Sequence, residues 1–285
     1  MRSFQQRKCF ITGAASGIGR ATALALAKEG ALLCLTDIRD ADLATACDSI
    51  RAEGGTVLAS RALDIADYDA VRAFADDIHR EHGSMDMLMN IAGISTWGTI
   101  ENLEIEHWKQ LVDINLMGPV HVLKSFVPAM IAAGNGGHIV NVSSAAGLFA
   151  LPWHTAYSAT KFGLRGISEV LRMDLAPHNI HVSLVCPGAV DTGLVRTINI
   201  VGIDREDPEV KQLTGRFQRH AVSPEQAAAA MLKGVRRNRF IVFTSLDIRV
   251  GYWFQRKWAL PYELVMRLLS RRVHRLAQSK IRTGK

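Results

Sequence analysis

The sequence predicts an α/β fold: a doubly wound parallel sheet of about seven strands with helices on both faces. Short apolar runs typical of buried strands alternate with longer helical patterns along the 285 residues. The composition, 48% hydrophobic and 21% charged, suits a chain that buries a sizeable core. No linker or repeat interrupts this alternation, so we expect one domain over residues 1–248 and a C-terminal helical extension over residues 249–285.

The alternation assigns each element in order. Strands are predicted at residues 8–12, 32–37, 56–62, 85–91, 137–142, 181–186 and 240–243. Helices are predicted at residues 18–29, 40–53, 67–82, 105–133, 155–176 and 224–236. The long irregular stretch is 191–222, and loops of that length in compact domains are usually lids or binding loops.

Charge is unevenly distributed along the chain. The net charge is +7, but residues 249–285 hold ten Lys and Arg against the single acid Glu263, which leaves the preceding residues near neutral. The basic balance therefore does not describe a general nucleic-acid-binding surface, and no nucleic-acid partner is expected.

Cysteine usage and the amino-terminal region indicate a reducing compartment. The four cysteines, Cys9, Cys34, Cys47 and Cys186, have no paired spacing, so we interpret them as reduced core residues without a disulfide or metal role, and no metal site is expected. Residues 1–7 lack the apolar run of a signal peptide. No apolar stretch approaches the roughly 20 residues that span a bilayer. We therefore expect a cytoplasmic protein.

A glycine-rich segment, TGAASGIG at residues 12–19, joins the first predicted strand to the first predicted helix. Glycines allow a pyrophosphate to approach the backbone, and the helix N-terminus offers it free N–H groups and a favourable dipole. The spacing departs from the usual G-x-G-x-x-G, and a plain strand-to-helix turn is the alternative interpretation. Asp37 ends the second strand, where a carboxylate accepts hydrogen bonds from the adenosine ribose and repels a 2′-phosphate. This favours a Rossmann-type site for NAD, although Arg39 nearby softens the preference and keeps NADP as an alternative.

Tyr157 and Lys161 lie four residues apart at the start of a predicted helix, so their side chains share one face. A nearby ammonium stabilises a phenolate, and we expect it to lower the pKa of Tyr157 from about 10 toward working pH, which gives a usable acid/base pair. Ser143 and Ser144 follow the strand at 137–142, at the edge where open α/β sheets bind ligands. The alternatives are a surface Tyr–Lys pair and a serine pair that caps a turn.

Taken together, the motifs resemble those of the short-chain dehydrogenase/reductase (SDR) family. They occur in the family's order and at its spacing from residue 8 to about residue 243: TGAASGIG at 12–19, NIAG at 90–93, Asn115, the serine pair, YSATK at 157–161 and PGAVDT at 187–192. Ile91 is a mild departure, because the family usually has a second asparagine there.

The resemblance implies a role for each matching residue. Tyr157 corresponds to the general acid/base, Lys161 to the residue that lowers its pKa and binds the nicotinamide ribose, Ser144 to the serine that orients the substrate, and Asn115 to the anchor of a proton-relay water. The implied cofactor contacts are Gly13, Ser16, Gly17, Ile18, Gly19, Asp37, Asp64, Ile65, Asn90, Ala92, Gly93, Tyr157, Lys161, Pro187, Gly188, Val190 and Thr192. The family also implies a homodimer or homotetramer through the helices predicted at 105–133 and 155–176.

The residues that flank these motifs predict the substrate pocket. Its wall is expected from Ser95, Trp97, Leu148, Phe149, Trp153, His154 and the loop 193–217, with Ser144 and Tyr157 at the reacting oxygen. This wall is mostly apolar and suggests a hydrophobic alcohol or ketone such as a lipid, steroid, terpenoid or alicyclic compound. The expected function is hydride transfer between NAD(H) and such a secondary alcohol or ketone. The alternatives are an NADP-dependent carbonyl or 3-ketoacyl reductase, and a nucleotide-binding scaffold or sensor.

Residues 249–285 lie outside the resemblance. Aromatic residues at 252, 253, 254 and 258 are interleaved with Arg256 and Lys257, and apolar residues then recur at helical spacing beside a row of arginines. One interpretation is peripheral docking on an anionic membrane surface. The other, which we favour on the sequence alone, is packing of the apolar face on the body or on a partner subunit, where it covers the pocket.

Overall fold

The structure, a computed structural model, describes residues 3–192, 199–202 and 221–281. Its main sheet has seven parallel strands in the order β3-β2-β1-β4-β6-β7-β9. The strand order reverses between β1 and β4, which is where open α/β sheets bind ligands. The predicted doubly wound sheet of about seven strands is confirmed. The strands are β1 (Lys8–Thr12), β2 (Leu32–Asp37), β3 (Thr56–Ala62), β4 (Met87–Asn90), β6 (Gly137–Val142), β7 (Ile180–Cys186) and β9 (Ile241–Phe243).

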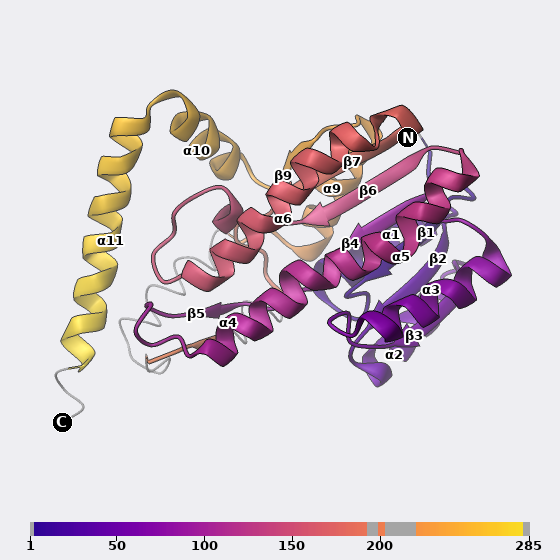
Figure 1. Ribbon diagram of the computed structural model, residues 1–285, viewed down its shortest axis with the longest axis horizontal. Helices are drawn as coiled ribbons and strands as arrows, with labels where there is room; N and C mark the ends of the chain where they lie inside the picture. Colours follow the sequence, from indigo (N-terminus) through magenta and orange to yellow (C-terminus); the bar gives the residue numbers. More distant parts are fainter. Residues whose placement is uncertain (1–2, 193–198, 203–220, 282–285) are drawn as a thin grey trace.

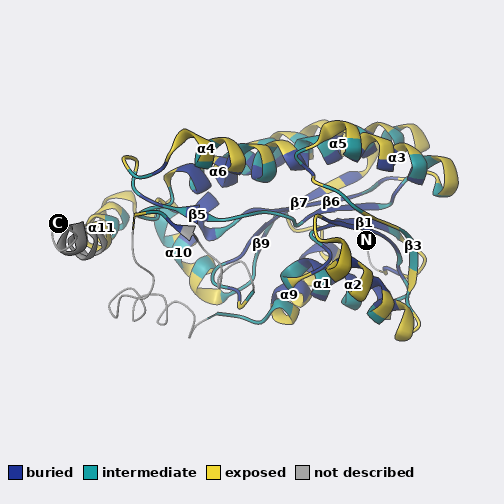
Figure 2. Cartoon of the chain, turned by 90° about the horizontal axis from the view of Figure 1, so that it is seen from below, coloured by how far each residue is buried: buried dark blue, intermediate teal, exposed yellow. Residues whose placement is uncertain are grey.

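Helices cover both faces of this sheet (Figure 2). One layer contains α1 (Gly17–Lys28), α2 (Asp40–Ala52) and α9 (Pro224–Arg236), and the other contains α3 (Tyr68–His82), α4 (Ile105–Val112), α5 (Gly118–Ala133) and α6 (Thr155–Asp174). Two apolar clusters fill the spaces between sheet and helices. Leu26 and Val140 belong to the first, and Phe10 and Phe126 pack in the second with ring centroids 4.4 Å apart. Apolar burial of this kind is the main stabilising contribution to such a fold.

The helix predicted over 105–133 is interrupted. A π-helical turn, Asp113–Met117, separates α4 from α5 and places Asn115 in the interior. π-Turns inside helices occur frequently at functional sites. Hydrophobic periodicity cannot detect the interruption, because the helix axis continues across it.

The stretch predicted as irregular, 191–222, contains a short strand. β8 (Asn199–Ile200) pairs in parallel with β5 (Thr96–Trp97), and a single bridge joins Val190 to Val222. Two-residue strands leave no periodicity for a sequence pattern to reveal.

The interrupted helix Ile105–Ala133 meets a length and hydropathy criterion for a membrane span, with a mean hydropathy of 1.4 in its best window. That result corrects the expectation that no such stretch exists, but it rests on length and composition alone. The apolar side of the helix packs against the sheet, where Val122, Phe126 and Met130 are fully buried. The apolar character therefore serves the domain core.

Two helices follow the sheet: α10 (Leu246–Lys257) and α11 (Ala259–Ile281). Tyr252 of α10 is buried against Phe243, with ring centroids 5.8 Å apart. The hydroxyl of Tyr262, in α11, accepts a hydrogen bond from the Ala150 backbone at 3.1 Å. Beyond this contact α11 projects away from the sheet (Figure 1). The division of the chain after residue 248 stays a prediction.

All four cysteines are free and buried, as predicted for core residues. Burial raises the pKa of Cys34 and of Cys186 to about 12, so both thiols stay protonated at neutral pH.

His138 is a buried titratable group in the middle of the sheet. Its Nε2 lies 2.8 Å from the Ser183 hydroxyl on the neighbouring strand, and that hydroxyl donates to the Arg239 carbonyl at 2.7 Å. His138 Nε2 must therefore carry the proton that Ser183 accepts, which leaves Nδ1 as a buried acceptor with no hydrogen-bond partner among the residues that the structure describes. Burial, which disfavours the cation, lowers the pKa of His138 to about 3.

We expect the free energy of unfolding to fall as the pH falls from about 6.5 toward about 3, because the unfolded chain binds a proton that folded His138 refuses. This one group should account for roughly 2 kcal/mol between pH 6.5 and 5. Urea unfolding of wild type and of His138→Met across this pH range measures the effect. The variant should have a shallower pH dependence whatever its absolute stability, and equal slopes in the two proteins would contradict this role of His138.

Candidate active site

The glycine loop between β1 and α1 is shaped by close backbone contacts. A Cβ on Gly19 would lie 1.9 Å from the Gly13 carbonyl oxygen, and a Cβ on Gly13 would lie 2.9 Å from the Cα of Ala92. Gly13 and Gly17 also have positive φ angles of 70° and 51°. Ser16 occupies the N-cap of α1 without a side-chain cap, so its hydroxyl does not close off the first N–H groups of the helix. A helix N-terminus whose backbone N–H groups are not capped by a side chain can bind a pyrophosphate.

Asp37 is buried at the end of β2 and is joined to the loop. One carboxylate oxygen accepts from the Ala15 N–H at 3.0 Å, and the other accepts from the Arg39 N–H at 3.1 Å. The Arg39 guanidinium lies 3.4 Å from Asp37 and donates to the Ser16 hydroxyl at 2.7 Å. From the sequence, Asp37 and Arg39 have separate effects on the choice between NAD and NADP. In the structure both side chains are hydrogen-bonded to the glycine loop. The site predicted for the adenosine ribose thus contains a carboxylate and a cation in contact.

Asn115 holds the turn that follows β4. Its Oδ1 accepts from the Ile94 N–H and its Nδ2 donates to the Ile94 carbonyl, both at 2.9 Å. The same Nδ2 lies 3.4 Å from the Thr160 hydroxyl of α6. A Cβ on Gly93 would lie 2.9 Å from Asn115 Oδ1 and 3.4 Å from Lys161 Nζ, so this turn packs directly over the lysine. The side-chain amide thus fixes the backbone, and a role as water anchor stays a prediction.

Ser144, Tyr157 and Lys161 come together between the end of β6 and the start of α6. The Ser144 side chain lies close enough to the Tyr157 hydroxyl to lower its pKa. Lys161 Nζ lies 5.6 Å from the centroid of the Tyr157 ring and donates to the Val142 carbonyl at 3.1 Å. The Ser143 hydroxyl instead donates to the Lys161 carbonyl at 2.9 Å. The two serines therefore have different partners, and the one beside the tyrosine is Ser144.

The predicted direction of the Tyr157 pKa is wrong for the protein chain itself. Burial raises the pKa of Tyr157, and the hydrogen bond with Ser144 lowers it by less. Lys161 is also buried, which lowers its own pKa to about 8. The ammonium faces the tyrosine ring and bonds to a backbone carbonyl, so desolvation outweighs its attraction for the phenolate.

Aromatic side chains predicted for the substrate wall line up beside Tyr157. The Trp97 ring packs against His154 with centroids 4.2 Å apart and planes tilted by 39°, and the His154 ring lies 6.1 Å from that of Tyr157. Trp97 Nε1 donates to the Ser95 hydroxyl at 2.8 Å. Trp153 has a positive φ of 65° and its carbonyl accepts from the Gly98 N–H at 2.8 Å, which ties the wall to the segment after β5.

His154 is neutral in this wall. Its Nδ1 lies 2.6 Å from the Pro152 carbonyl, which can only accept, so Nδ1 carries the proton and Nε2 keeps its lone pair. Burial lowers the pKa of His154 to about 4. At neutral pH this residue offers an acceptor and no charge.

The segment after β7 returns to the glycine loop. The Pro187 carbonyl accepts from the Ala145 N–H at 2.7 Å, and a Cβ on Gly188 would meet Ile248 at 2.9 Å. The Thr192 methyl carbon lies 3.1 Å from the position of a Cβ on Gly17. Buried Val190 fixes the segment through its bridge to Val222. The segment predicted to contact the nicotinamide, 187–192, therefore lies next to the glycine loop predicted to bind the pyrophosphate. The loop 193–217 predicted for the substrate pocket lies outside the described residues, apart from 199–202.

Comparison with known proteins shows which family the chain belongs to. Residues 7–200 match the family model described as short chain dehydrogenase. The putative oxidoreductase SadH of Mycobacterium tuberculosis is 36% identical over 251 residues, 87% of this chain and 90% of that protein. The chain belongs to the short-chain dehydrogenase family. It is therefore an oxidoreductase of this family with a Rossmann-type fold.

Two further relatives bear on cofactor and substrate. The trans-4-hydroxycyclohexanecarboxylate dehydrogenase of Sinomonas cyclohexanicum is 35% identical over 219 residues, 73% of this chain and 84% of that protein. The crystal structure of a short-chain dehydrogenase/reductase from Burkholderia phymatum in complex with NAD has a TM-score of 0.81, is 29% identical, and covers 90% of this chain and 95% of its own. Similar solved structures include complexes with NAD and with NADP, so NAD(P) is the cofactor class of this short-chain dehydrogenase.

Some predicted cofactor contacts have other neighbours in this short-chain dehydrogenase. The Ile65 side chain is buried and packs over Gly118, so it serves the core, whereas Asp64 beside it is exposed. The Asn90 side chain is also buried and donates to Asn141 at 2.8 Å. The adenine contacts expected from Asp64 and Ile65 stay predictions.

Sequence reasoning missed a supporting role for Thr12. Its buried hydroxyl accepts from the N–H groups of Ile91 and Ala92 at 3.0 and 3.1 Å, which joins the NIAG segment to the end of β1. A threonine at the end of a strand looks like an ordinary strand residue. Only the pairing of β1 with β4 reveals this contact.

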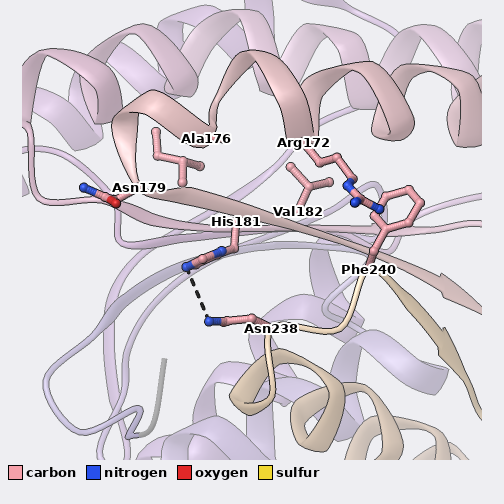
Figure 3. A pocket seen from close by; sticks show the side chains of 8 residues that line it. Arg172, Ala176, Asn179, His181, Val182, Asn238 and Phe240 are labelled. Atoms are coloured by element: carbon pink, nitrogen blue, oxygen red, sulfur yellow. Dashed lines mark hydrogen bonds between the residues drawn. The ribbon is translucent and has the colours of Figure 1, made fainter.

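A separate pocket of about 380 Å³ lies away from this site (Figure 3). It lies where β7 begins, whereas Ser144 and Tyr157 lie at the carboxyl ends of the strands. His181 Nε2 and Asn238 Nδ2 are 3.4 Å apart in it. Its lining residues are Arg172, Ala176, Asn179, Ile180, His181, Val182, Asn238 and Phe240.

Asn115→Ala should destabilise the fold, because it leaves the Ile94 N–H and carbonyl without their side-chain partners. Losing hydrogen-bond partners costs roughly 1–3 kcal/mol for each buried group. Urea unfolding of the variant, with exposed Asn135→Ala as the matched control, measures this cost. If both variants unfold at the same urea concentration, Asn115 does not hold this turn.

Proposed function

We propose that this protein is an NAD(H)-dependent dehydrogenase that interconverts an apolar secondary alcohol and its ketone. The observation that carries the proposal is the buried Tyr157, which lies beside Ser144 and faces Lys161. The aromatic wall of Trp97 and His154 beside it supports an apolar substrate. A relative whose named substrate carries a hydroxyl on a cyclohexane ring supports a secondary alicyclic alcohol.

The glycine loop fits a dinucleotide, because its carbonyl contacts leave no room for Cβ atoms and the N-terminus of α1 is uncapped by Ser16. In the proposal the loop residues hold the pyrophosphate, Asp37 the adenosine ribose, Lys161 the nicotinamide ribose and Thr192 the carboxamide. When bound, the nicotinamide ring accepts or delivers the hydride.

The protein's own residues orient the substrate and move one proton. In alcohol oxidation the Tyr157 phenolate takes the hydroxyl proton while the Ser144 hydroxyl donates to the same substrate oxygen. In ketone reduction neutral Tyr157 donates that proton. Because burial raises the pKa of Tyr157, the neutral phenol predominates at pH 7. The rate of alcohol oxidation should therefore increase as the pH rises and the phenolate forms.

We infer a preference for NAD from Asp37, since a carboxylate beside the ribose repels a 2′-phosphate. The contact of Arg39 with both Asp37 and Ser16 supports a second candidate, an NADP-dependent carbonyl or 3-ketoacyl reductase. In that case the guanidinium would leave Asp37 and pair with the 2′-phosphate.

We also propose a cytoplasmic homo-oligomer. Four free, buried cysteines support a reducing compartment. Exposed Phe162, Val170 and Met173 on α6 support subunit contact through this helix, whether the assembly is a dimer or a tetramer.

Tyr157→Phe should lower kcat for oxidation of apolar secondary alcohols by at least about 100-fold, because it removes the acid/base group. NADH affinity should change little, since the ring and its neighbours remain. Steady-state kinetics with a panel of cyclohexanols and steroid alcohols, together with NADH fluorescence titration, tests both points. Tyr68→Phe, at a half-exposed tyrosine of α3, is the matched control.

Full activity in Tyr157→Phe would contradict the assigned mechanism. Binding of NADH without turnover of any alcohol or ketone by the wild type would favour the scaffold or sensor alternative.

Asp37→Asn should raise the ratio of NADPH to NADH affinity by about tenfold, which corresponds to about 1.4 kcal/mol of relieved repulsion. Separate fluorescence titrations of the two reduced cofactors measure this ratio. Asp42→Asn is the matched control, because Asp42 pairs with the same Arg39 from an exposed position. Submicromolar NADPH binding with weak NADH binding by the wild type would overturn the preference for NAD and support the reductase alternative.

A further inference from the structure

We propose that α10 and α11 form a docking surface for an anionic lipid bilayer. This docking surface comprises residues 253–271, none of which is among the residues predicted to bind cofactor or substrate. The inference stands on exposure, charge and placement, each of which is independent of turnover.

Large apolar side chains of the docking surface lie open to solvent. Leu260, Leu264 and Leu268 are 80%, 61% and 56% exposed, and their spacing of four residues places them along one side of α11. Val265 and Leu269 are exposed on a neighbouring side. The described surface of this helix therefore shows apolar groups that a folded chain normally covers.

Two tryptophans mark the corner between α10 and α11. Trp253 and Trp258 are each 54% exposed, and their rings meet edge to face at 5.8 Å. Phe254 packs against Trp258 at 5.5 Å. Tryptophan is enriched at the level of lipid headgroups, where an apolar ring with one polar N–H is favourably placed.

Basic side chains accompany these apolar groups. Arg256 and Lys257 end α10 and are exposed, as are Arg267 and Arg271 on α11. The single acid of residues 249–285, Glu263, pairs with Arg267. The segment therefore keeps a strong positive charge, and a helix with basic and apolar sides is typical of one that lies in a membrane interface.

The docking surface is held at a defined place on the body. Tyr252 of α10 is buried, and Tyr262 of α11 contacts Phe149 of the predicted substrate wall with ring centroids 6.4 Å apart. α11 projects from there away from the sheet (Figure 1). If the proposed apolar substrate is correct, this position lets the substrate pass from the bilayer to the wall.

Charge decides against the other occupants. A second copy would bring the same excess, ten Lys and Arg against one acid, to a symmetric contact between tails. The rest of the chain is close to neutral, so it offers little net charge to compensate this excess. A nucleic acid would satisfy the cations but would leave the leucines and tryptophans exposed. An anionic bilayer meets both requirements at once.

Vesicle flotation of the full chain tests the proposal, using phosphatidylcholine alone and phosphatidylcholine with about one-third phosphatidylglycerol. We expect binding to the anionic vesicles and its loss at high salt. Each basic contact at such a surface contributes roughly a fivefold gain in partitioning, so Arg256→Glu, Lys257→Glu and Arg271→Glu together should weaken binding by at least about 100-fold. Leu260→Ser, Leu264→Ser and Leu268→Ser together should also weaken it.

The matched control reverses three exposed charges on and just after α9, with Lys233→Glu, Arg237→Glu and Arg239→Glu, and should keep vesicle binding. Tyr157→Phe should bind vesicles as the wild type does, which separates this test from the proposed activity. The proposal is overturned if the wild type does not bind anionic vesicles, if the α9 control loses binding equally, or if the leucine variant instead converts an oligomer to monomers at unchanged vesicle binding.

Discussion

The chemistry proposed for this protein depends on one constraint, the burial of a tyrosine and a lysine beside each other. Removing Lys161 from water lowers its pKa to about 8, and removing Tyr157 from water raises the pKa of the phenol. Neither group could remain buried without polar partners, since unpaired buried polar groups are costly. The Val142 carbonyl, at the end of β6, accepts from Lys161, and Ser144, two residues further on, lies beside Tyr157. The position of this strand end in the sheet therefore fixes the groups proposed to react.

The surrounding structure keeps that strand end in register with the cofactor groove. Thr12 joins β1 to the turn after β4, and Asn115 holds the next residues of the same turn from the π-helical break. Gly93 lies between them, and a Cβ there would lie 2.9 Å from Asn115 Oδ1, so a side chain would displace Asn115. The geometry of the proposed catalytic residues thus depends on backbone segments brought together by parallel strand pairing and connected by side-chain amides and hydroxyls.

The sequence predicted most of the fold, since strands buried on both faces and amphipathic helices have strong periodicities. It also predicted which residues gather, because motif spacing reflects strand ends and helix faces. It could not predict the pKa direction of Tyr157, which depends on burial, or the burial of the Ile65 side chain over Gly118, which depends on packing between distant elements. The exposure of the apolar side of α11 could not be predicted either, because periodicity identifies an apolar helix face but not whether other residues cover it.

The most direct test of the central constraint is an NMR titration of Tyr157 in the free protein, with ¹³C-labelled tyrosine and the Tyr157→Phe variant for assignment. If desolvation dominates, the Tyr157 resonance should remain that of a neutral phenol up to at least about pH 10, the ordinary value for tyrosine. Ionisation of Tyr157 below about pH 9 in the free protein would show that the Lys161 charge outweighs burial, and would contradict desolvation as the effect that keeps the proton on the phenol.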